Sequence, residues 1–325
     1  MMKKTLFLPL LVALSLNTAF AYTEVGLHPS SSYTASGTAM GGAVASLPAH
    51  PSNLWVNPGG LAYQTGILFY AAPHDEVTGY DEEIRDRIFM ASYAGFAGGT
   101  VGAAFILRQQ KDQTFLQDGG SFPVDINEPA FLVSYGRKAT GSLGVGLSAI
   151  GYQHRADKDA IDGDPAFGIT AGVLYRTEYL HKGRTPIDLR CGFAVANAGP
   201  RFDLGEGEAD LPLNLRTGFS ARWEKERGTE VTGAADLYVL YRDIGSGSDF
   251  DRWGGGVGVE AKMNGVVAVR AGYRWDDDYR PDDWTYGFGV GNEVYEHVGG
   301  MIEYAHAPGE GDFADHIGLR LYWIP

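Results

Sequence analysis

Cysteine is nearly absent from this 325-residue chain, which contains only Cys191. A single cysteine excludes an intramolecular disulfide framework, so the fold must be held together in another way. Basic residues are also scarce: 26 Lys and Arg stand against 40 Asp and Glu, which gives a formal net charge of −14. This balance argues against nucleic acid as a partner, because nucleic-acid recognition calls for a basic face.

Long apolar runs are missing as well. Beyond residue 21, no stretch stays apolar over the roughly 18 residues that a membrane-spanning helix needs. The chain begins MMKKTLFLPLLVALSLNTAFA, with two lysines, an apolar core over residues 5–16 and a small-x-small ending. That core is too short for a membrane anchor, so we interpret residues 1–21 as a signal peptide.

Motifs of catalysis and metal binding are not found either. The sequence contains no G-x-S-x-G, H-E-x-x-H, C-x-x-C or P-loop pattern, and the glycine-rich stretch 254–260 alternates like a strand. The acidic stretches 157–165 and 275–284 lack EF-hand spacing, so solvated loops are the simpler interpretation. We therefore expect no enzyme, no cofactor and no metal site.

The chain is rich in alternation between apolar and polar or small residues. In LNLRTGFSARW (213–223), every second side chain is apolar or Thr, and Asn, Arg, Gly and Ser stand between them. A period of two over this length predicts β-strands. Fourteen such segments follow the first 62 residues. They lie near 63–73, 86–96, 99–109, 128–138, 141–152, 166–177, 186–196, 212–223, 229–241, 253–263, 265–275, 284–292, 296–305 and 315–323.

The connections between these segments alternate between short and long, and the long ones hold most of the acidic residues. Short turns on one side and long loops on the other are typical of barrels in the bacterial outer membrane. The sequence therefore predicts an all-β protein, a 14-stranded antiparallel transmembrane β-barrel. The alternative is a soluble sandwich or propeller, but the repeat of 40–50 residues that a propeller needs is not found.

Aromatic residues fall near the predicted strand ends, where barrels carry interfacial girdles. The predicted outer girdle is Tyr241, Trp253, Trp275 and Trp284, and the predicted periplasmic girdle is Tyr135, Tyr175, Trp223 and Trp323. The last strand also ends in an aromatic, as such barrels commonly do, although Ile324 and Pro325 follow it.

A barrel of this size encloses a lumen that its own side chains do not fill. Glycines at inward positions (Gly144, Gly146, Gly256, Gly258, Gly287, Gly289, Gly291) widen it further. We expect residues 22–62 to fold into the lumen as a plug, called the hatch from here on, with residues 63–325 forming the barrel. Residues 39–47 are expected to form a short helix, and Asn57-Pro58-Gly59-Gly60 a sharp turn.

Seven charged residues fall on the predicted lumen side of their strands. They are Arg190, Arg216, Asp236, Glu260, Arg270, Glu303 and Arg320. Charges inside a barrel are expected to pair or to be hydrated. We interpret this set as an ion-pair lining that supports the hatch; contact with a transported ligand is the alternative.

The stretch GTAMGGAVASLPAHPSNLWVNPGGLA resembles the N-terminal signature of the PorV/PorQ-type family, which is related to the FadL-type hydrophobic-compound channels. The matching residues are Met40, Gly41, Gly42, Ala43, Asn57, Pro58, Gly60 and Leu61. Gly59 stands where the family usually has Ala, and His50-Pro51 replaces its acidic pair. The resemblance implies a 14-stranded barrel with an inward-folded hatch, over nearly the whole mature chain.

Three functions remain open at this point. The resemblance to the PorV/PorQ type implies a role in protein secretion or surface display of the type IX kind, with secretion components and exported proteins as partners. The relation to FadL implies a channel for small hydrophobic compounds. A structural outer-membrane protein is the third. Lipids and lipopolysaccharide of the outer membrane are expected neighbours in every case, and nucleic acid in none.

Overall fold

The computed structural model describes most of the chain from Thr34 onwards. The described ranges are 34–77, 83–117, 120–156, 164–179, 187–200, 202–203, 208–209, 211–225, 228–244, 248–276, 283–295, 297–308 and 313–324. The predicted signal peptide and the first part of the hatch lie outside these ranges, as do parts of the long acidic connections.

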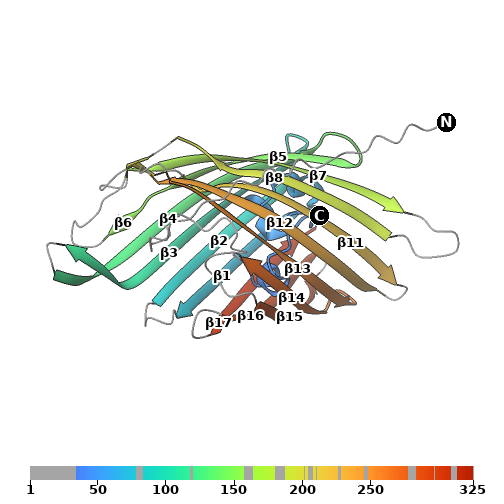
Figure 1. Cartoon of the computed structure of the whole chain (residues 1–325). Helices are drawn as coiled ribbons and strands as arrows, with labels where there is room; N and C mark the ends of the chain where they lie inside the picture. The colour runs from blue at the N-terminus through green and yellow to red at the C-terminus, as the bar shows by residue number, and fades with distance from the viewer. Residues whose placement is uncertain are drawn as a thin grey trace.

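A closed antiparallel barrel makes up the molecule (Figure 1). Its fourteen long strands are β1 (Ile67–Val77), β2 (Glu83–Phe96), β3 (Gly99–Gln117), β4 (Gly120–Lys138), β5 (Leu143–Tyr152), β7 (Ala166–Tyr179), β8 (Ile187–Ala198), β11 (Leu213–Lys225), β12 (Thr229–Ile244), β13 (Ser248–Met263), β14 (Val267–Asp276), β15 (Asp283–Tyr295), β16 (Val298–Pro308) and β17 (Phe313–Trp323). β17 pairs with β1, beginning at Ile67 opposite Trp323, which closes the ring. The predicted fold is therefore confirmed.

Three two-residue strands add to the barrel beyond the predicted pattern. They are β6 (Arg155–Ala156), which pairs with β4, and β9 (Phe202–Asp203) and β10 (Glu208–Ala209), which pair with each other. β3 and β4 are 19 residues long, considerably longer than the predicted segments. Their extra length lies on the side of the long connections.

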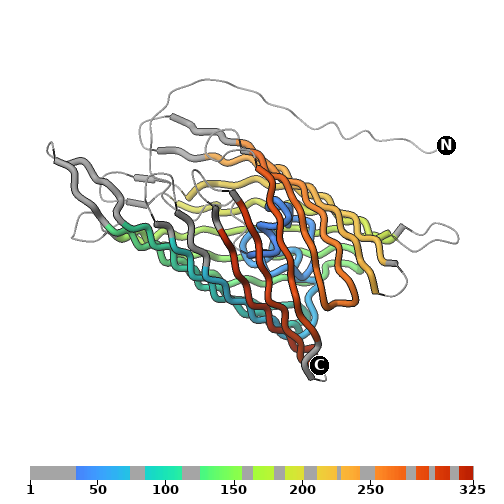
Figure 2. The backbone as a smooth tube through the Cα atoms, turned by 90° about the horizontal axis from the view of Figure 1, so that it is seen from below, coloured from blue at the N-terminus to red at the C-terminus, as the bar shows by residue number. Residues whose placement is uncertain are grey.

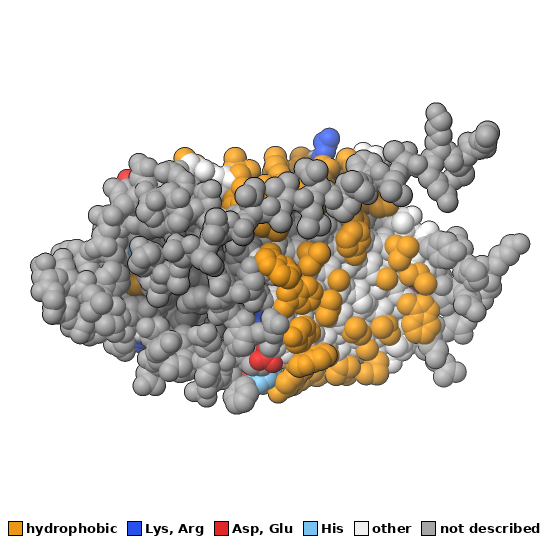
Figure 3. All heavy atoms as spheres, in the orientation of Figure 1, with side chains coloured by type: hydrophobic (Ala, Val, Ile, Leu, Met, Phe, Trp, Pro, Cys, Tyr) orange, Lys and Arg blue, Asp and Glu red, His pale blue; other side chains and the backbone are white. Residues whose placement is uncertain are grey.

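The outer wall is apolar, as a barrel in lipid requires. Alternate side chains on every strand point outwards, and Figure 3 shows hydrophobic side chains spread over the described part of one face. Six of the eight predicted girdle residues are exposed on this wall: Trp284, Trp253, Tyr175, Trp323, Tyr241 and Trp223. The other two, Tyr135 and Trp275, are half-buried. No helix among the described residues is long and apolar enough to cross a membrane.

The described part of the hatch lies inside the lumen, where Figure 2 shows it as the coiled segment enclosed by the strands. It contains α1 (Ala35–Ala39) and two 3-10 helices, η1 (Pro51–Leu54) and η2 (Pro58–Tyr63). Two expectations are corrected here. The helix ends at Ala39, where the predicted one begins, because Gly41 and Gly42 adopt positive φ angles of 64° and 79°.

The second correction concerns the first strand, which begins at Ile67 and not near Tyr63. Residues 58–63 form η2, because Pro58 occupies the first turn and the Asn57 side chain accepts a hydrogen bond from the Gly59 N–H (3.1 Å). Gly66, with a φ of 67°, then turns the chain into the wall.

Candidate functional site: the hatch docked in the lumen

Inward-facing glycines let the hatch backbone lie directly against the barrel wall. A Cβ built on Gly146 would lie 2.3 Å from the Pro58 carbonyl oxygen, and one on Gly258 would lie 2.4 Å from that of Met40. The same holds around most of the ring: hatch atoms occupy the Cβ positions of Gly102, Gly136, Gly144, Gly146, Gly172, Gly192, Gly256, Gly258, Gly272 and Gly287. Of the glycines expected to widen the lumen, only Gly289 and Gly291 meet wall atoms alone.

A buried carboxylate on β12 holds the middle of the hatch. Asp236 Oδ2 accepts hydrogen bonds from the backbone N–H groups of Val44 (2.9 Å) and Ala45 (2.8 Å). The same oxygen pairs with Arg216 Nε at 3.0 Å, and Arg216 Nη2 donates to the Gly42 carbonyl. One ion pair thus binds backbone groups of three hatch residues, Gly42, Val44 and Ala45, which lie outside a helix and need partners elsewhere.

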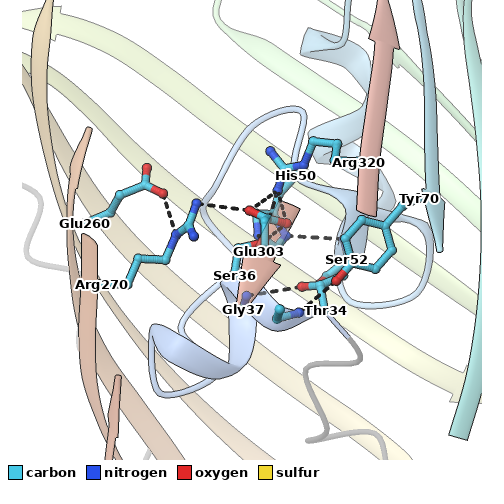
Figure 4. A network of polar contacts seen from close by, with 11 residues as sticks. Thr34, Ser36, Gly37, His50, Ser52, Tyr70, Glu260, Arg270, Glu303 and Arg320 are labelled. Carbon is cyan, nitrogen blue, oxygen red and sulfur yellow. Dashed lines mark hydrogen bonds and ion pairs between the residues drawn. The ribbon is translucent and has the colours of Figure 1, made fainter. Parts of the chain in front are cut away.

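A second buried carboxylate, Glu303 on β16, holds the beginning of the hatch (Figure 4). Its oxygens pair with Arg270 Nη2 at 3.0 Å and with Arg320 Nη2 at 3.1 Å. Ser36 Oγ donates to Glu303 (3.3 Å) and accepts from Arg320 (3.0 Å), and Arg270 extends the network to Glu260 at 2.7 Å. The network joins four strands to α1, and the Tyr70 hydroxyl adds a fifth strand by accepting the Ala35 N–H at 2.8 Å.

His50 joins this network from the other end of the hatch. Its Nδ1 accepts the backbone N–H of Ser52 at 3.2 Å, which caps η1, and its Nε2 lies 3.2 Å from Ser36 Oγ. The proton therefore lies on Nε2 and is donated to Ser36. This is not the arrangement of a nucleophile and its base, because the base would have to accept the serine proton at that nitrogen.

Burial and the nearby charges of Arg320 and Arg270 lower the pKa of His50 well below its ordinary value of 6.5. In an undocked hatch His50 would titrate near that value, so acid favours the undocked state. The stabilising effect of neutral His50 is complete above about pH 6.5. It falls by about 1.4 kcal/mol for each pH unit below that, until the lowered pKa is reached.

We therefore expect the hatch to loosen as the pH falls from 7 to 5. The readout is the rate at which a thiol reagent labels Ser46→Cys in a Cys191→Ser background, relative to the exposed Gly141→Cys. Ser46 is fully buried, and its hydroxyl has no partner among the described residues. His50→Asn, which keeps the cap without a titrating ring, should abolish most of the pH dependence; an unchanged profile in this variant would contradict the assignment.

The turn at Asn57 anchors the end of the hatch on the opposite wall. Asn57 Nδ2 donates to the carbonyl oxygens of Ala45 (2.6 Å) and Val173 (3.0 Å), so one amide joins two hatch segments to β7. The Gly60 carbonyl accepts the Ala49 N–H at 3.1 Å, and Leu61 is fully buried. The turn predicted from the sequence is thus a docking element as well as a chain reversal.

An apolar wall faces the hatch on β1 to β5. Its side chains belong to one buried cluster with hatch residues: Tyr70, Ala72, Ile88, Met90, Ala104, Ile106, Ala130, Leu132, Ile150 and Tyr152 from these strands, together with Val44, Ala45, Leu54, Trp55, Val56 and Leu61. Charged side chains dominate the contacts on β11 to β17, as described above. The lumen at the hatch therefore has one apolar side and one ionic side.

A layer of buried polar residues follows the apolar wall towards the long connections. Glu128 is fully buried and receives hydrogen bonds from the Tyr152 hydroxyl and from Gln110 Nε2 (3.2 Å), with His154 Nδ1 at 3.0 Å. Next to it Arg108 binds both Asp86 oxygens at 2.9 Å. Sequence reasoning missed this layer because its members lie near the ends of the predicted strands or beyond them.

All seven charges predicted for the lumen point inwards, but they do not form one lining. Arg216 and Asp236 form one pair, and Arg270, Glu260, Glu303 and Arg320 form one network. Arg190 lies apart and pairs with Asp188 at 2.6 Å, a partner that the prediction left out. Residues 188 and 190 lie on the same side of an alternating strand, so the periodicity that placed Arg190 in the lumen also places Asp188 there.

Within the described ranges, no three His, Cys, Asp or Glu side chains lie close enough together to hold a metal ion. The acidic stretch 157–165 and much of 275–284, considered above as calcium loops, lie mostly outside those ranges.

The closed fourteen-stranded barrel, its apolar outer wall and its internal hatch define a β-barrel protein of the bacterial outer membrane. No protein-family model matches the chain, and no curated protein matches it. Solved structures with the same fold include the toluene transporter TodX of Pseudomonas putida, at 14% identity over 89% of this chain and 96% of that one, with a TM-score of 0.54. The toluene transporter TbuX of Ralstonia pickettii is similar as well, at 15% identity over 92% and 99%, with a TM-score of 0.53.

The monoaromatic hydrocarbon channel CymD shares the fold too, at 12% identity over 93% of this chain and 97% of that one, with a TM-score of 0.51. These likenesses show that the chain has the fold of these proteins. They do not distinguish a PorV/PorQ-type protein, so that narrower assignment stays a prediction.

Proposed function

We propose that the protein is a channel for small hydrophobic compounds in the outer membrane, acting without chemical change of the compound. The apolar wall inside the lumen carries this proposal. A water-filled pore for polar solutes needs a polar lining, whereas the side chains of β1 to β5 next to the hatch are mostly aliphatic or aromatic, with a few buried serines among them. The solved structures with the same fold, named as toluene transporters and a monoaromatic hydrocarbon channel, support the same substrate class.

The secretion role of the PorV/PorQ type has narrower support, because it depends on the sequence resemblance alone. A buried apolar wall has no evident purpose in passing exported proteins to the cell surface. The structural role explains the same wall as the surface against which the hatch packs, but the solved structures with this fold, which are named as transporters and a channel, give it no support. We therefore place the channel first and keep type IX-like secretion, with exported proteins as partners, as the competing proposal.

A deletion strain separates the two. If the protein is the proposed channel, cells without it should take up toluene more slowly at low external concentration, and the gene on a plasmid should restore the rate. Proteins attached to the surface through C-terminal sorting signals should be unaffected. Normal toluene uptake combined with loss of those surface proteins would favour the secretion role instead.

A further inference from the structure

The two sides of the hatch present a hydrophobic molecule with very different surroundings. On β11 to β17 such a molecule would have to displace the ion pair of Arg216 with Asp236 or the network around Glu303, which leaves buried charges without partners. On β2 to β5 the buried side chains next to residues 51–56 are apolar residues and uncharged serines, and the buried ion pair of Arg108 with Asp86 lies further towards the long connections. If the chain conducts hydrophobic compounds, as proposed above, the second side offers the lower barrier.

Residues 51–56 form the edge of the hatch on this apolar side. Leu54 is fully buried and Trp55 nearly so, in the same cluster as Ile88, Met90 and Leu132 of the wall. Gly102 on β3 leaves space for this edge, because an added Cβ there would lie 2.9 Å from Leu54 Cδ2. We call the contact between residues 51–56 and β2 to β5 the seam.

Two serines hold the seam closed through a single backbone atom. The Leu54 carbonyl oxygen accepts hydrogen bonds from Ser134 Oγ on β4 (2.8 Å) and Ser148 Oγ on β5 (2.6 Å). These two residues are direct partners in the register of β4 and β5, and both are buried. The bonds carry no charge, so opening them leaves no buried ion without a partner.

The ionic side has a matching contact that lies away from the seam. Ser220 Oγ on β11 donates to the Ser46 carbonyl at 3.2 Å, so it too is a buried serine bound to a hatch carbonyl. It differs from Ser134 and Ser148 in its neighbourhood, because the Asp236 pair holds the adjacent hatch residues Val44 and Ala45. This serine is the natural control for the other two.

We propose that hydrophobic compounds pass the hatch along the seam, and that Ser134 and Ser148 are positioning residues that keep the seam closed by binding the Leu54 carbonyl. Passage then needs only the edge of the hatch at residues 51–56 to move. The ionic contacts of residues 36 and 42–45 stay in place meanwhile and keep the lumen closed to polar solutes.

The test compares Ser134→Ala/Ser148→Ala with Ser220→Ala in cells that carry the gene on a plasmid. Two rates are measured: the initial uptake of toluene, and the entry of a polar β-lactam hydrolysed by a periplasmic enzyme. We expect the double variant to raise toluene uptake about fivefold or more, since two buried hydrogen bonds are lost. The β-lactam rate should stay at that of the natural chain, and Ser220→Ala should change neither rate.

Other outcomes overturn the proposal. Toluene uptake that stays the same or falls in the double variant excludes the seam as the route. An equal rise in Ser220→Ala, or a rise of both solutes in the double variant, means that the serines merely stabilise the whole hatch. If the natural chain itself gives no more toluene uptake than the deletion strain, the proposed channel function fails instead. Heat-modifiable migration on gels shows in each case that the barrel has formed.

Discussion

Asp236→Ala is expected to release the middle of the hatch. The variant leaves Arg216 buried without its carboxylate and two backbone N–H groups, those of Val44 and Ala45, without an acceptor. Removing one partner of a buried pair costs about 3–5 kcal/mol, because the remaining charge stays desolvated. The labelling rate of Ser46→Cys, measured in the Cys191→Ser background, should therefore rise by a factor on the order of 100 or more.

The matched control is Asp164→Asn, since Asp164 is exposed next to β7. It should leave the labelling rate unchanged. Replacing both partners with apolar residues of similar size, Asp236→Leu with Arg216→Met, should cost less than Asp236→Ala alone, because no buried charge then remains. If Asp236→Ala labels no faster than the control, this ion pair does not hold the hatch.

The second large effect is expected from a single methyl group on β8. A Cβ on Gly192 would lie 2.1 Å from the Ala45 carbonyl oxygen and 2.9 Å from Asn57 Nδ2, which are themselves hydrogen-bonded to each other. Gly192→Ala must therefore push the hatch off the wall at the point where its two halves meet. Overpacking of this kind costs about 1–3 kcal/mol, so labelling of Ser46→Cys should rise roughly 5- to 150-fold.

Gly233→Ala on β12 provides the control, because a Cβ there meets nothing within 4 Å. Both variants should still form a heat-modifiable barrel, because neither substitution removes a hydrogen bond between strands of the wall. An equal response of the two variants would show that glycine content in the strands, and not contact with the hatch, determines the effect.

The alternating pattern was sufficient to predict the barrel. In a strand that faces lipid on one side and a lumen on the other, every residue is assigned to one side by its position alone. This is why the inward positions of Arg216, Asp236 and Glu303 could be predicted from the sequence. Strand ends were harder to predict, because β3 and β4 extend into residues 110–127, where the sequence no longer alternates regularly between apolar and polar residues.

The sequence predicted which residues form the hatch, but not the conformation that they adopt. Its helix was expected over residues 39–47, ending before Pro48, yet α1 ends at Ala39 and turns follow it. So short a helix has little stability of its own. Its conformation depends on the wall against which it docks, and the glycines that contact it lie up to 248 residues further along the chain, as Gly287 does from Ala39.

By itself, the sequence determined the strands, the sides of their residues and the presence of material to fill the lumen, because these follow from local periodicity and composition. The tertiary structure alone decided which charges meet. It placed Asp236 under residues 44–45, Glu303 between two arginines and Ser36, and the apolar wall against Leu54. Barrel closure and strand tilt determine which of these residues come into contact, and neither can be read from the alternation within a single strand.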